Sequence, residues 1–483
     1  MTSLRQRALA ATTWSGADIL VRQGLQFAVS VALARLLAPE DFGTIALLYL
    51  FTGIASVFVD SGLSAALIQK QDVSHEDEST VFWFNLLIGM LAALLLAAAA
   101  PAIARFYGAP VIKPLTLVMA ACVFIGAMGA IHGTLLTKRL DFRSQMKVGV
   151  VASVVSGAIA VWLAATGWGV WALAAQLLVS AVLTTLLLWV VNPWRPKFVF
   201  SMVSARKLFG FGGYMLASGL LDMVYTRMYT VLIGRLFGVR ELGYYNRADG
   251  TKQLPAGALA GILSRVSFPV FSQAAGDPAR LCNGVRTSVR MIMLVNVPAM
   301  IGMAAVAEPL VITLFGVEWA PAVPILKVLC LAGIFWPLHV INLNVLMAMG
   351  HSRLMFRLEV VKKLVGIPLL IAGVKFGVMG VAWSTVVFGF LAFLINAHYT
   401  RLHIKYGAIQ QMHDALPALG MALAMYVVVS LLAHMWEASQ PVMLAGLIAA
   451  GGGTYVILAG LLRPRVVSEV LKFVAPGGNR HDA

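Results

Sequence analysis

The sequence predicts an all-α membrane protein with about fourteen transmembrane helices, and three observations lead to this fold class. Hydrophobic residues make up 60% of the 483-residue chain, and charged residues make up only 12%. Apolar runs of about 18 residues or more, long enough to span a bilayer as helices, fill nearly the whole sequence. Residues 34–43 recur as residues 234–243, with Arg, Leu, an acidic residue and Gly in the same register. The chain is therefore expected to consist of two similar halves.

The expected spans are helices because backbone polar groups in lipid must be satisfied within their own segment. The alternating ten-residue segments of a membrane β-barrel are absent from the sequence. Connections are at most about 15 residues long, so no soluble domain is expected between spans. In order, the expected spans are residues 12–38, 41–69, 79–105, 111–137, 147–166, 169–191, 208–235, 250–274, 287–315, 319–349, 354–375, 377–400, 413–435 and 440–462.

The offset between the two repeat copies predicts how the halves are related. At roughly 33 residues for a span with its loop, the offset corresponds to about six helices. An even number keeps both copies parallel, so a pseudo-two-fold axis along the membrane normal is expected, as in one large group of secondary transporters. The predicted parts are an N-terminal lobe (1–200), a C-terminal lobe (201–411), and two further helices with a tail (412–483). Transport is thus the first functional hypothesis.

The orientation in the membrane is predicted from the distribution of positive charge. With the N-terminus inside, the inner segments hold about 24 of the 36 Lys and Arg residues and the outer loops about 6. Both termini are therefore expected in the cytoplasm. The loop of residues 70–79 carries four acidic residues, but acidic residues contribute little to this rule. Asp18 and Arg22 interrupt the first apolar run early, so it is interpreted as a retained span rather than a cleaved signal peptide.

Net charge and cysteine content narrow the partners further. The net charge of +16 lies mostly on the inner rim, where it meets anionic lipid head groups, so nucleic-acid binding is not predicted. The three cysteines have no disulfide or metal spacing, and His132, His339 and His398 are isolated. A lone histidine in a membrane helix is interpreted as a hydrogen-bond donor between helices. No metal or other cofactor is expected, and coupling of transport to a proton or to sodium is left open.

Several motifs occur in order over roughly residues 10–350. They are LARLLAPEDFG (33–43), DSGLSAALIQ (60–69), FWFN (82–85), LDFR (140–143), GYYNR (243–247), FPVFS (268–272) and LFGVEW (314–319). In these motifs the sequence resembles bacterial polysaccharide-unit flippases of the Wzx type, in particular the branch of colanic acid and teichuronic acid exporters.

This resemblance implies membership of the multidrug/oligosaccharidyl-lipid/polysaccharide (MOP) exporter superfamily. The implied fold is two six-helix bundles around a central cavity, with two extra C-terminal helices. The implied activity is translocation of undecaprenyl-diphosphate-linked oligosaccharide units from the inner to the outer leaflet of the bacterial inner membrane. Implied partners are membrane lipids, a polysaccharide polymerase and a chain-length regulator. A peptidoglycan-precursor relative uses cavity arginines of its first and eighth helices, but no local motif transfers these roles to this chain.

Charged residues within the expected spans are the candidate substrate-binding residues, because a charge at bilayer depth needs a cavity or a partner. In the first span, polar side chains recur every three to four residues and so share one helix face: Ser15, Asp18, Arg22, Gln26 and Ser30. One interpretation is a cavity lining in which Asp18 orients Arg22 toward an anionic substrate. The alternative is a buried ion pair between helices.

The seventh and eighth spans supply the other candidates. Asp222 belongs to a polar stripe like that of the first span, whereas Arg227 points about 140° away from Asp222. Arg265 lies deep in the eighth span and is interpreted as a substrate contact. Lys252 near the outer end of that span is a further candidate, although it could instead extend to the interface.

Other membrane charges are weaker candidates. Asp60 and Glu308 are considered for ion coupling, with a structural role for Asp60 and a pairing of Glu308 with Lys327 as the alternatives. Arg35 and Arg235 end matching helices before acidic turns and are assigned to capping and salt bridges. Three charged residues near the start of the eleventh span are expected to face water or lipid phosphates: Glu359, Lys362 and Lys363.

Two other functions remain as alternatives to a lipid-linked oligosaccharide flippase. A multidrug exporter of the same fold would favour acidic and aromatic residues, so arginines within the membrane count against it. A membrane polymerase, ligase or glycosyltransferase would need a large outer catalytic loop or an Asp-x-Asp metal motif, and the sequence contains neither.

Overall fold

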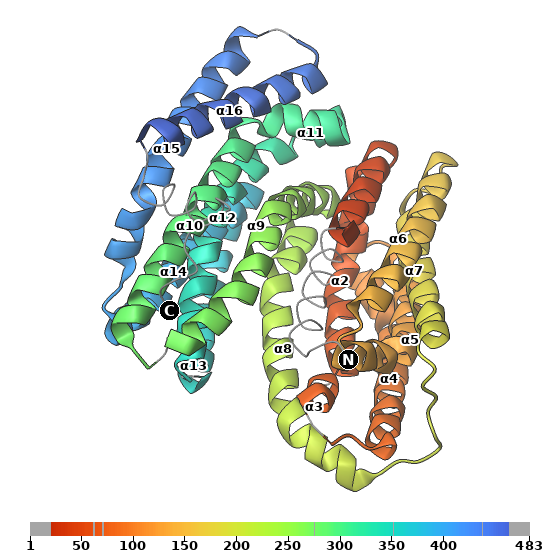
Figure 1. Ribbon diagram of the computed structural model, residues 1–483. Coiled ribbons are helices and arrows are strands. Elements are labelled where there is room, and N and C mark those ends of the chain that lie inside the picture. The colour runs from red at the N-terminus through yellow and green to blue at the C-terminus, as the bar shows by residue number, and fades with distance from the viewer. Residues whose placement is uncertain are drawn as a thin grey trace. The chain divides into compact units, whose positions relative to one another are not determined.

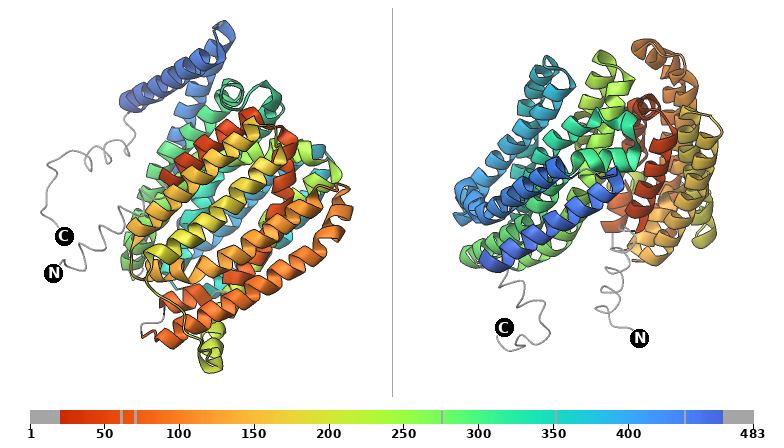
Figure 2. Two further views of the ribbon diagram at one scale, coloured as in Figure 1. Left: turned by 90° about the vertical axis from the view of Figure 1, so that its right-hand side faces the viewer. Right: turned by 90° about the horizontal axis from the view of Figure 1, so that it is seen from above.

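The computed structural model of the protein describes residues 21–60, 63–69, 72–274, 276–350, 352–436 and 438–462. Every regular element in these ranges is helical, and they contain no strand (Figures 1 and 2). Ten of the described helices are long and apolar enough to cross a membrane. The predicted all-α membrane fold is thereby confirmed, whereas the count of fourteen spans stays a prediction.

The chain divides into two compact units, Met1–Gly243 and Tyr244–Ala483. In the first unit, α2 packs on α4, α5 and α8, α4 runs along α5, and α7 contacts both α5 and α6. Its described helices are residues 21–36, α2 (Pro39–Asp60), α3 (Leu63–Gln69), α4 (His75–Tyr107), α5 (Ile112–Lys138), α6 (Phe142–Ala165), α7 (Val170–Val191) and α8 (Met202–Leu236). The proposed lobe boundaries at residues 200 and 411 stay predictions.

The second unit is built around α12 and α14, with α10 joining α12 to α15. α13 packs on α14, and α16 contacts α11 and α15 (Figure 1). Its elements are α9 (Val239–Ala274, which begins shortly before the division), α10 (Pro278–Ala305), α11 (Ala307–Phe315), the 3-10 helix η1 (Val317–Trp319), α12 (Ala322–Ala348), α13 (Ser352–Val374), α14 (Gly377–Ile404), α15 (Ala408–Met435) and α16 (Gln440–Leu462).

One predicted span is interrupted in the structure: the ninth is divided into α10 and α11. Pro309 explains this interruption: it has no N–H to donate, so it fits the first turn of a new helix better than the interior of a continuous one. The helix predicted to begin at residue 250 begins at Val239, the position that matches the start of α2 at Pro39 in the repeat.

Three long helices of the described residues are not among the ten that are apolar enough to cross a membrane: α8, α9 and α13. Each charged residue lowers the mean hydropathy of its segment, and all three helices contain charged residues that were candidates from the sequence. These residues are Asp222, Arg227, Lys252, Arg265, Glu359, Lys362 and Lys363. Most of the candidate charged side chains therefore lie in helices outside the apolar set.

The segment between α7 and α8 is fastened along the start of α4. The indole N–H of Trp194 donates to Glu78 (2.7 Å), and that of Trp83 donates to the carbonyl of Lys197 (2.8 Å). Asp77 forms a capping box with Ser74. Acidic residues of the 70–79 loop thus have structural partners, which explains why this loop departs from the basic composition of the other predicted inner loops.

The two copies of the repeat meet at their glycines. A Cβ atom on Gly43 would overlap the main-chain carbonyl of Val239, and one on Gly243 would overlap that of Pro39. Between these contacts the carboxylate of Glu40 lies 3.2 Å from Nε of its repeat partner Arg240. Exchange of equivalent contacts is the pattern that two-fold-related segments produce. Only glycine allows backbones to approach this closely.

Replacing Gly43 or Gly243 by Ala should lower the thermal stability of the purified protein, because the added methyl group forces the two helix starts apart. The expected cost is about 1–3 kcal/mol, as for other overpacked sites. The measurement is thermal unfolding in detergent. Gly126→Ala within α5 is the matched control: no atom lies within 4 Å of its added Cβ, so stability should stay equal or rise. Equal effects at all three glycines would contradict a close crossing.

Candidate functional site

The predicted substrate residues are distributed over both compact units. Arg22, Asp222 and Arg227 lie in the first, and Lys252 and Arg265 lie in the second. Asp18 lies outside the described residues, and the side chains of Asp60 and Arg265 are not described. A cavity shared by Arg22 and Arg265 consequently stays a prediction.

Arg22 is positioned by a glycine of α6. A Cβ atom on Gly149 would lie 2.9 Å from Cδ of Arg22, and one on Gly157 would overlap the side chain of Val29. The two glycines are about two turns apart on α6 and thus form one groove along that helix. The aliphatic part of the half-buried Arg22 side chain lies in this groove. The absence of a side chain at residue 149 therefore determines where the charge of Arg22 is held.

Arg227 and Asp222 lie on different sides of α8. The guanidinium of Arg227 is 5.8 Å from the ring centroid of Tyr49 on α2, within the range of a cation–π interaction. Met223, one turn earlier on the same face, packs against Gly53 of α2. Asp222 is exposed. The structure thus places Arg227 at the contact between α2 and α8, where the aromatic ring stabilises its charge.

Lys252 is buried and does not extend to the surface. Its Nζ lies 2.6 Å from Oδ1 of Asp249, which precedes it by three residues on α9. The neighbouring Arg247 lies over the rings of Phe315 and Trp319, at 4.8 and 4.9 Å from their centroids. Both cations of this helix face thus have a partner within the second unit.

The predicted pairing of Glu308 with Lys327 is not found. Both side chains are exposed, and no ion pair joins them. Glu308 instead lies in the first turn of α11, where an acidic side chain stabilises the positive end of the helix dipole.

The prediction that Lys362 and Lys363 face water or lipid phosphates is wrong. Their exposed fractions are 1% and 8%, whereas the neighbouring Leu364 is 65% exposed. Lys362 Nζ lies 2.5 Å from Glu359 Oε1. α13 therefore turns its lysines toward the protein and apolar side chains outward, as a lipid-facing helix requires. Residue type alone had suggested the opposite, because lysines near a helix end usually extend to the interface.

His339 joins two helices by a hydrogen bond, but as the acceptor rather than the expected donor. The side-chain amide N–H of Asn396 donates to His339 Nδ1 at 2.9 Å, so the bond joins α12 to α14. In the part of the chain that the structure describes, no three His, Cys, Asp or Glu side chains are grouped as a metal site would require.

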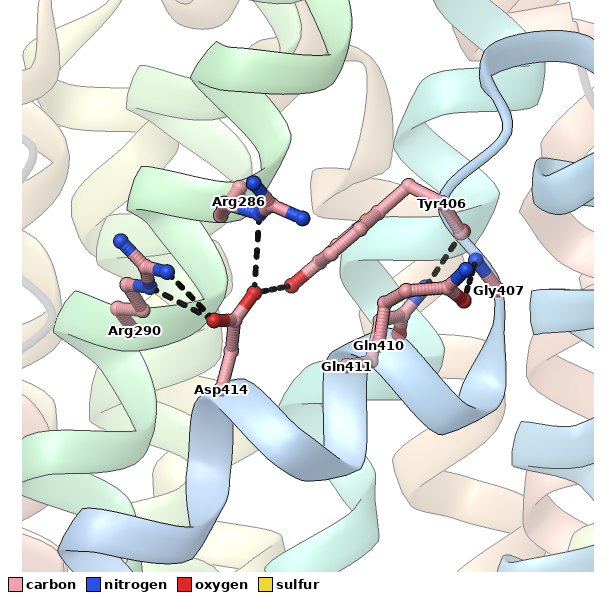
Figure 3. A network of polar contacts seen from close by, with 7 residues as sticks. All are labelled: Arg286, Arg290, Tyr406, Gly407, Gln410, Gln411 and Asp414. Carbon is pink, nitrogen blue, oxygen red and sulfur yellow. Dashed lines mark hydrogen bonds and ion pairs between the residues drawn. The ribbon is translucent and has the colours of Figure 1, made fainter.

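A four-residue network joins α10 to α15 and was not anticipated from the sequence (Figure 3). Asp414 Oδ1 accepts from Nε and Nη2 of Arg290, at 3.0 and 2.6 Å. Its Oδ2 accepts from the hydroxyl of Tyr406 at 2.9 Å and lies 3.1 Å from Nε of Arg286. Burial, and then the contact with Asp414, raises the pKa of Tyr406 well above its ordinary value, so the phenol remains a donor. The feature of the sequence that could have revealed this network is the four-residue spacing of Arg286 and Arg290, which places both side chains on one face of a helix.

The family profile described as "Polysaccharide biosynthesis protein" matches residues 32–324 of the chain. The chain belongs to the polysaccharide biosynthesis protein family. It is 28% identical to the teichuronic acid biosynthesis protein of Bacillus subtilis (strain 168) over 481 residues, 98% of this chain and 99% of that protein.

Solved structures show the same fold. Lipid II flippase MurJ in an inward closed conformation has a TM-score of 0.77 at 17% identity, covering 94% of this chain and 99% of that one. An inward-facing multidrug resistance transporter of the MATE family, within the MOP superfamily, has a TM-score of 0.62 at 19% identity, covering 79% and 94%. The predicted resemblance to bacterial polysaccharide biosynthesis proteins is confirmed, and the protein is a multi-pass membrane protein with the fold of these two structures.

Replacing Glu359 by Gln should destabilise the second unit, because it removes the carboxylate beside a buried ammonium. The expected loss is about 2 kcal/mol, below the roughly 3–5 of a fully buried pair, because the Glu359 side chain is 29% exposed. Thermal unfolding of the purified protein measures it. Adding Lys362→Met to the Glu359→Gln variant should restore most of the stability, and Glu318→Gln at an exposed residue should have no effect. A double variant no more stable than Glu359→Gln would contradict the pairing.

Proposed function

We propose that this protein is a flippase that moves undecaprenyl-diphosphate-linked oligosaccharide units from the inner to the outer leaflet of the bacterial inner membrane. Two comparisons together carry the proposal, one of the fold and one of the sequence. The fold matches a lipid II flippase over 94% of the chain, and the sequence belongs to a polysaccharide biosynthesis family. A lipid carrier and a saccharide unit together describe a lipid-linked oligosaccharide.

The chemistry of such a substrate fits the charged helices. A diphosphate is bound best by cations that donate hydrogen bonds to two of its oxygens at once, and the guanidinium of arginine provides this geometry. Arg22 is held on α6 by its aliphatic part, and Arg227 is held on α2 by a ring. In the proposed mechanism these residues act with Asp18, Asp222, Lys252 and Arg265 in a hydrated cavity, while the polyprenyl chain remains in lipid. Alternating access of that cavity to the two leaflets would carry the head group across.

Further parts of the proposal follow from the sequence. Both termini lie in the cytoplasm, and the substrate is loaded from the leaflet where it is synthesised. The protein is a transporter rather than an enzyme, with a polysaccharide polymerase and a chain-length regulator as downstream partners. Asp60 or Glu308 would bind the coupling ion if transport uses a proton or sodium.

Export of cationic drugs is the second candidate, and the similarity to a MATE transporter favours it. A cation-binding cavity, however, needs acidic side chains in excess, because arginine repels a cationic substrate. The six residues predicted to bind the substrate comprise four cations and two acids. An anionic substrate is therefore the better match.

The segments of residues 138–147, 192–207 and 350–363, which include the starts of α6, α8 and α13, should lie on the cytoplasmic side, because each carries four positive charges. The measurement is labelling of single cysteines with a membrane-impermeant maleimide in spheroplasts, after replacement of Cys122, Cys282 and Cys330 by Ser. A cysteine near Arg240 should react, and exposed cysteines in the three segments should react only after permeabilisation. Labelling of the 192–207 segment in intact spheroplasts would contradict this topology.

Replacing Arg22 or Arg265 by Ala should reduce polysaccharide export about 10- to 150-fold, because each lost charge-assisted contact to the diphosphate costs roughly 1.5–3 kcal/mol. Lys at either position should retain part of the activity, since the charge survives without the bidentate fork. The measurements are export in cells and accumulation of lipid-linked units on the inner leaflet.

The matched control is Arg35→Ala, which removes an exposed arginine at the end of the same first helix. It should export normally at equal protein levels. Normal export by both the Arg22 and Arg265 variants would show that neither arginine anchors the substrate.

A further inference from the structure

The network of Arg286, Arg290, Tyr406 and Asp414 contains more positive than negative charge. Two guanidinium groups share one carboxylate, whose side chain is 6% exposed. Oδ1 of Asp414 accepts two hydrogen bonds from Arg290, and Oδ2 accepts one from Tyr406 and lies 3.1 Å from Nε of Arg286, so both oxygens are already engaged. Among the ion pairs of the described residues, no second acid contacts either arginine. One positive charge of the network is therefore uncompensated.

Both arginines have N–H donors that Asp414 does not use. Arg286 contacts Asp414 through Nε, and its terminal amino groups point away from the carboxylate (Figure 3). The side chain of Arg286 is 40% exposed, and that of Arg290 is 23% exposed. Arg286 also lies over the ring of Tyr406, 5.3 Å from its centroid, which limits the directions its fork can take. Two partly exposed guanidinium groups are thus held in place before any ligand arrives.

The network lies close to the connection between two helices that are long and apolar enough to cross a membrane. Tyr406 belongs to the short connection between α14 and α15, and Asp414 lies within the first two turns of α15. We therefore expect the network near the level of the lipid head groups. Long arginine side chains at this level extend their charge to the interface while their stems remain in lipid.

The surroundings are also basic. Arg280 in the first turn of α10 is exposed, as are Arg401 and Lys405 at the end of α14. Arg401 lies beside Gly407, next to Tyr406 in the chain. The nearby exposed acid is Asp277, which caps α10 by accepting from the main-chain N–H groups of Ala279 and Arg280. An anion approaching this end of the helices meets an excess of positive charge.

We propose that Arg286 and Arg290, held in place by Asp414 and Tyr406, bind the phosphate group of an anionic phospholipid between the ends of α10 and α15. The phosphate oxygens accept from the terminal amino groups that Asp414 does not use. The lipid supplies the missing negative charge and its acyl chains lie along the apolar surface of the two helices. This site is separate from the residues proposed for substrate transport and does not rest on that proposal.

The test compares lipids and phosphate on the purified full-length protein in uncharged detergent. Phosphatidylglycerol should raise the midpoint of thermal unfolding, whereas phosphatidylcholine and inorganic phosphate at the same concentration should not. Native mass spectrometry should show retained phosphatidylglycerol. Equal stabilisation by phosphatidylcholine would overturn the proposal of a charge-selective site, and equal stabilisation by inorganic phosphate would overturn a lipid as the ligand.

Single substitutions test which arginine binds the phospholipid. Arg286→Gln should weaken the apparent affinity for phosphatidylglycerol about ten-fold, because one charge-assisted contact is lost. Arg280→Gln is the matched control: it removes an exposed arginine of the same helix that has no contact with Asp414, and its affinity should stay within about two-fold. Equal affinities of the Arg286→Gln variant and the unmodified protein would overturn the assignment.

Asp414→Asn distinguishes a lipid site from a purely structural ion pair and covers the case in which Arg286→Gln does not fold. Without lipid this variant should unfold at a lower temperature, since both arginines lose their acid. Phosphatidylglycerol should then stabilise it more than it stabilises the unmodified protein, because two uncompensated charges attract the phosphate. A smaller stabilisation than in the unmodified protein would mean that the network only joins α10 to α15.

Discussion

A charge inside a membrane helix must have a partner, and much of the described side-chain arrangement follows from that requirement. Lys362 meets Glu359, and Lys252 meets Asp249, each three residues away on its own helix. Arginines use aromatic rings as well as acids: Arg227 lies over Tyr49, and Arg247 lies over Phe315 and Trp319. Because lipid offers neither water nor counter-ions, an unpaired charge would cost more than the fold could supply. These partners, which lie within the same unit, stabilise the helices that carry the charges.

Close packing of helices depends on a second constraint, which is that lipid provides no hydrophobic driving force between apolar helices. Small residues then matter because they permit contact over a larger area. Gly149 receives the aliphatic part of Arg22, Gly53 receives Met223, and Gly43 with Gly243 lets two helix starts touch through their backbones. These glycines position charged and polar groups that the same helices carry. A stripe of small residues and the placement of an arginine are thus parts of one arrangement.

Much of the architecture was predictable because hydrophobic runs of sufficient length have one stable form in a bilayer. The all-α class, the order of the spans and the resemblance to polysaccharide exporters followed from composition, run lengths and ordered motifs. The interruption between α10 and α11 was missed, because a proline within an apolar run permits either a kink or a new helix. The start of α9 at Val239 was also missed, although the repeat contained the signal, since its polar residues were assigned to a loop.

The sequence identified the candidate side chains, but it did not predict their environments. Arg22, Arg227 and Lys252 could be selected because charged residues are rare in apolar segments. Whether each one meets lipid, water or another helix depends on helix rotation and on neighbours distant in sequence. The inward orientation of Lys362 and the meeting of Asp414 with two arginines some 124 residues away were decided by tertiary packing. The sequence by itself placed these charges in helices that are predicted to cross the membrane; the tertiary structure alone decided their partners, because pairing requires geometry that no local pattern encodes.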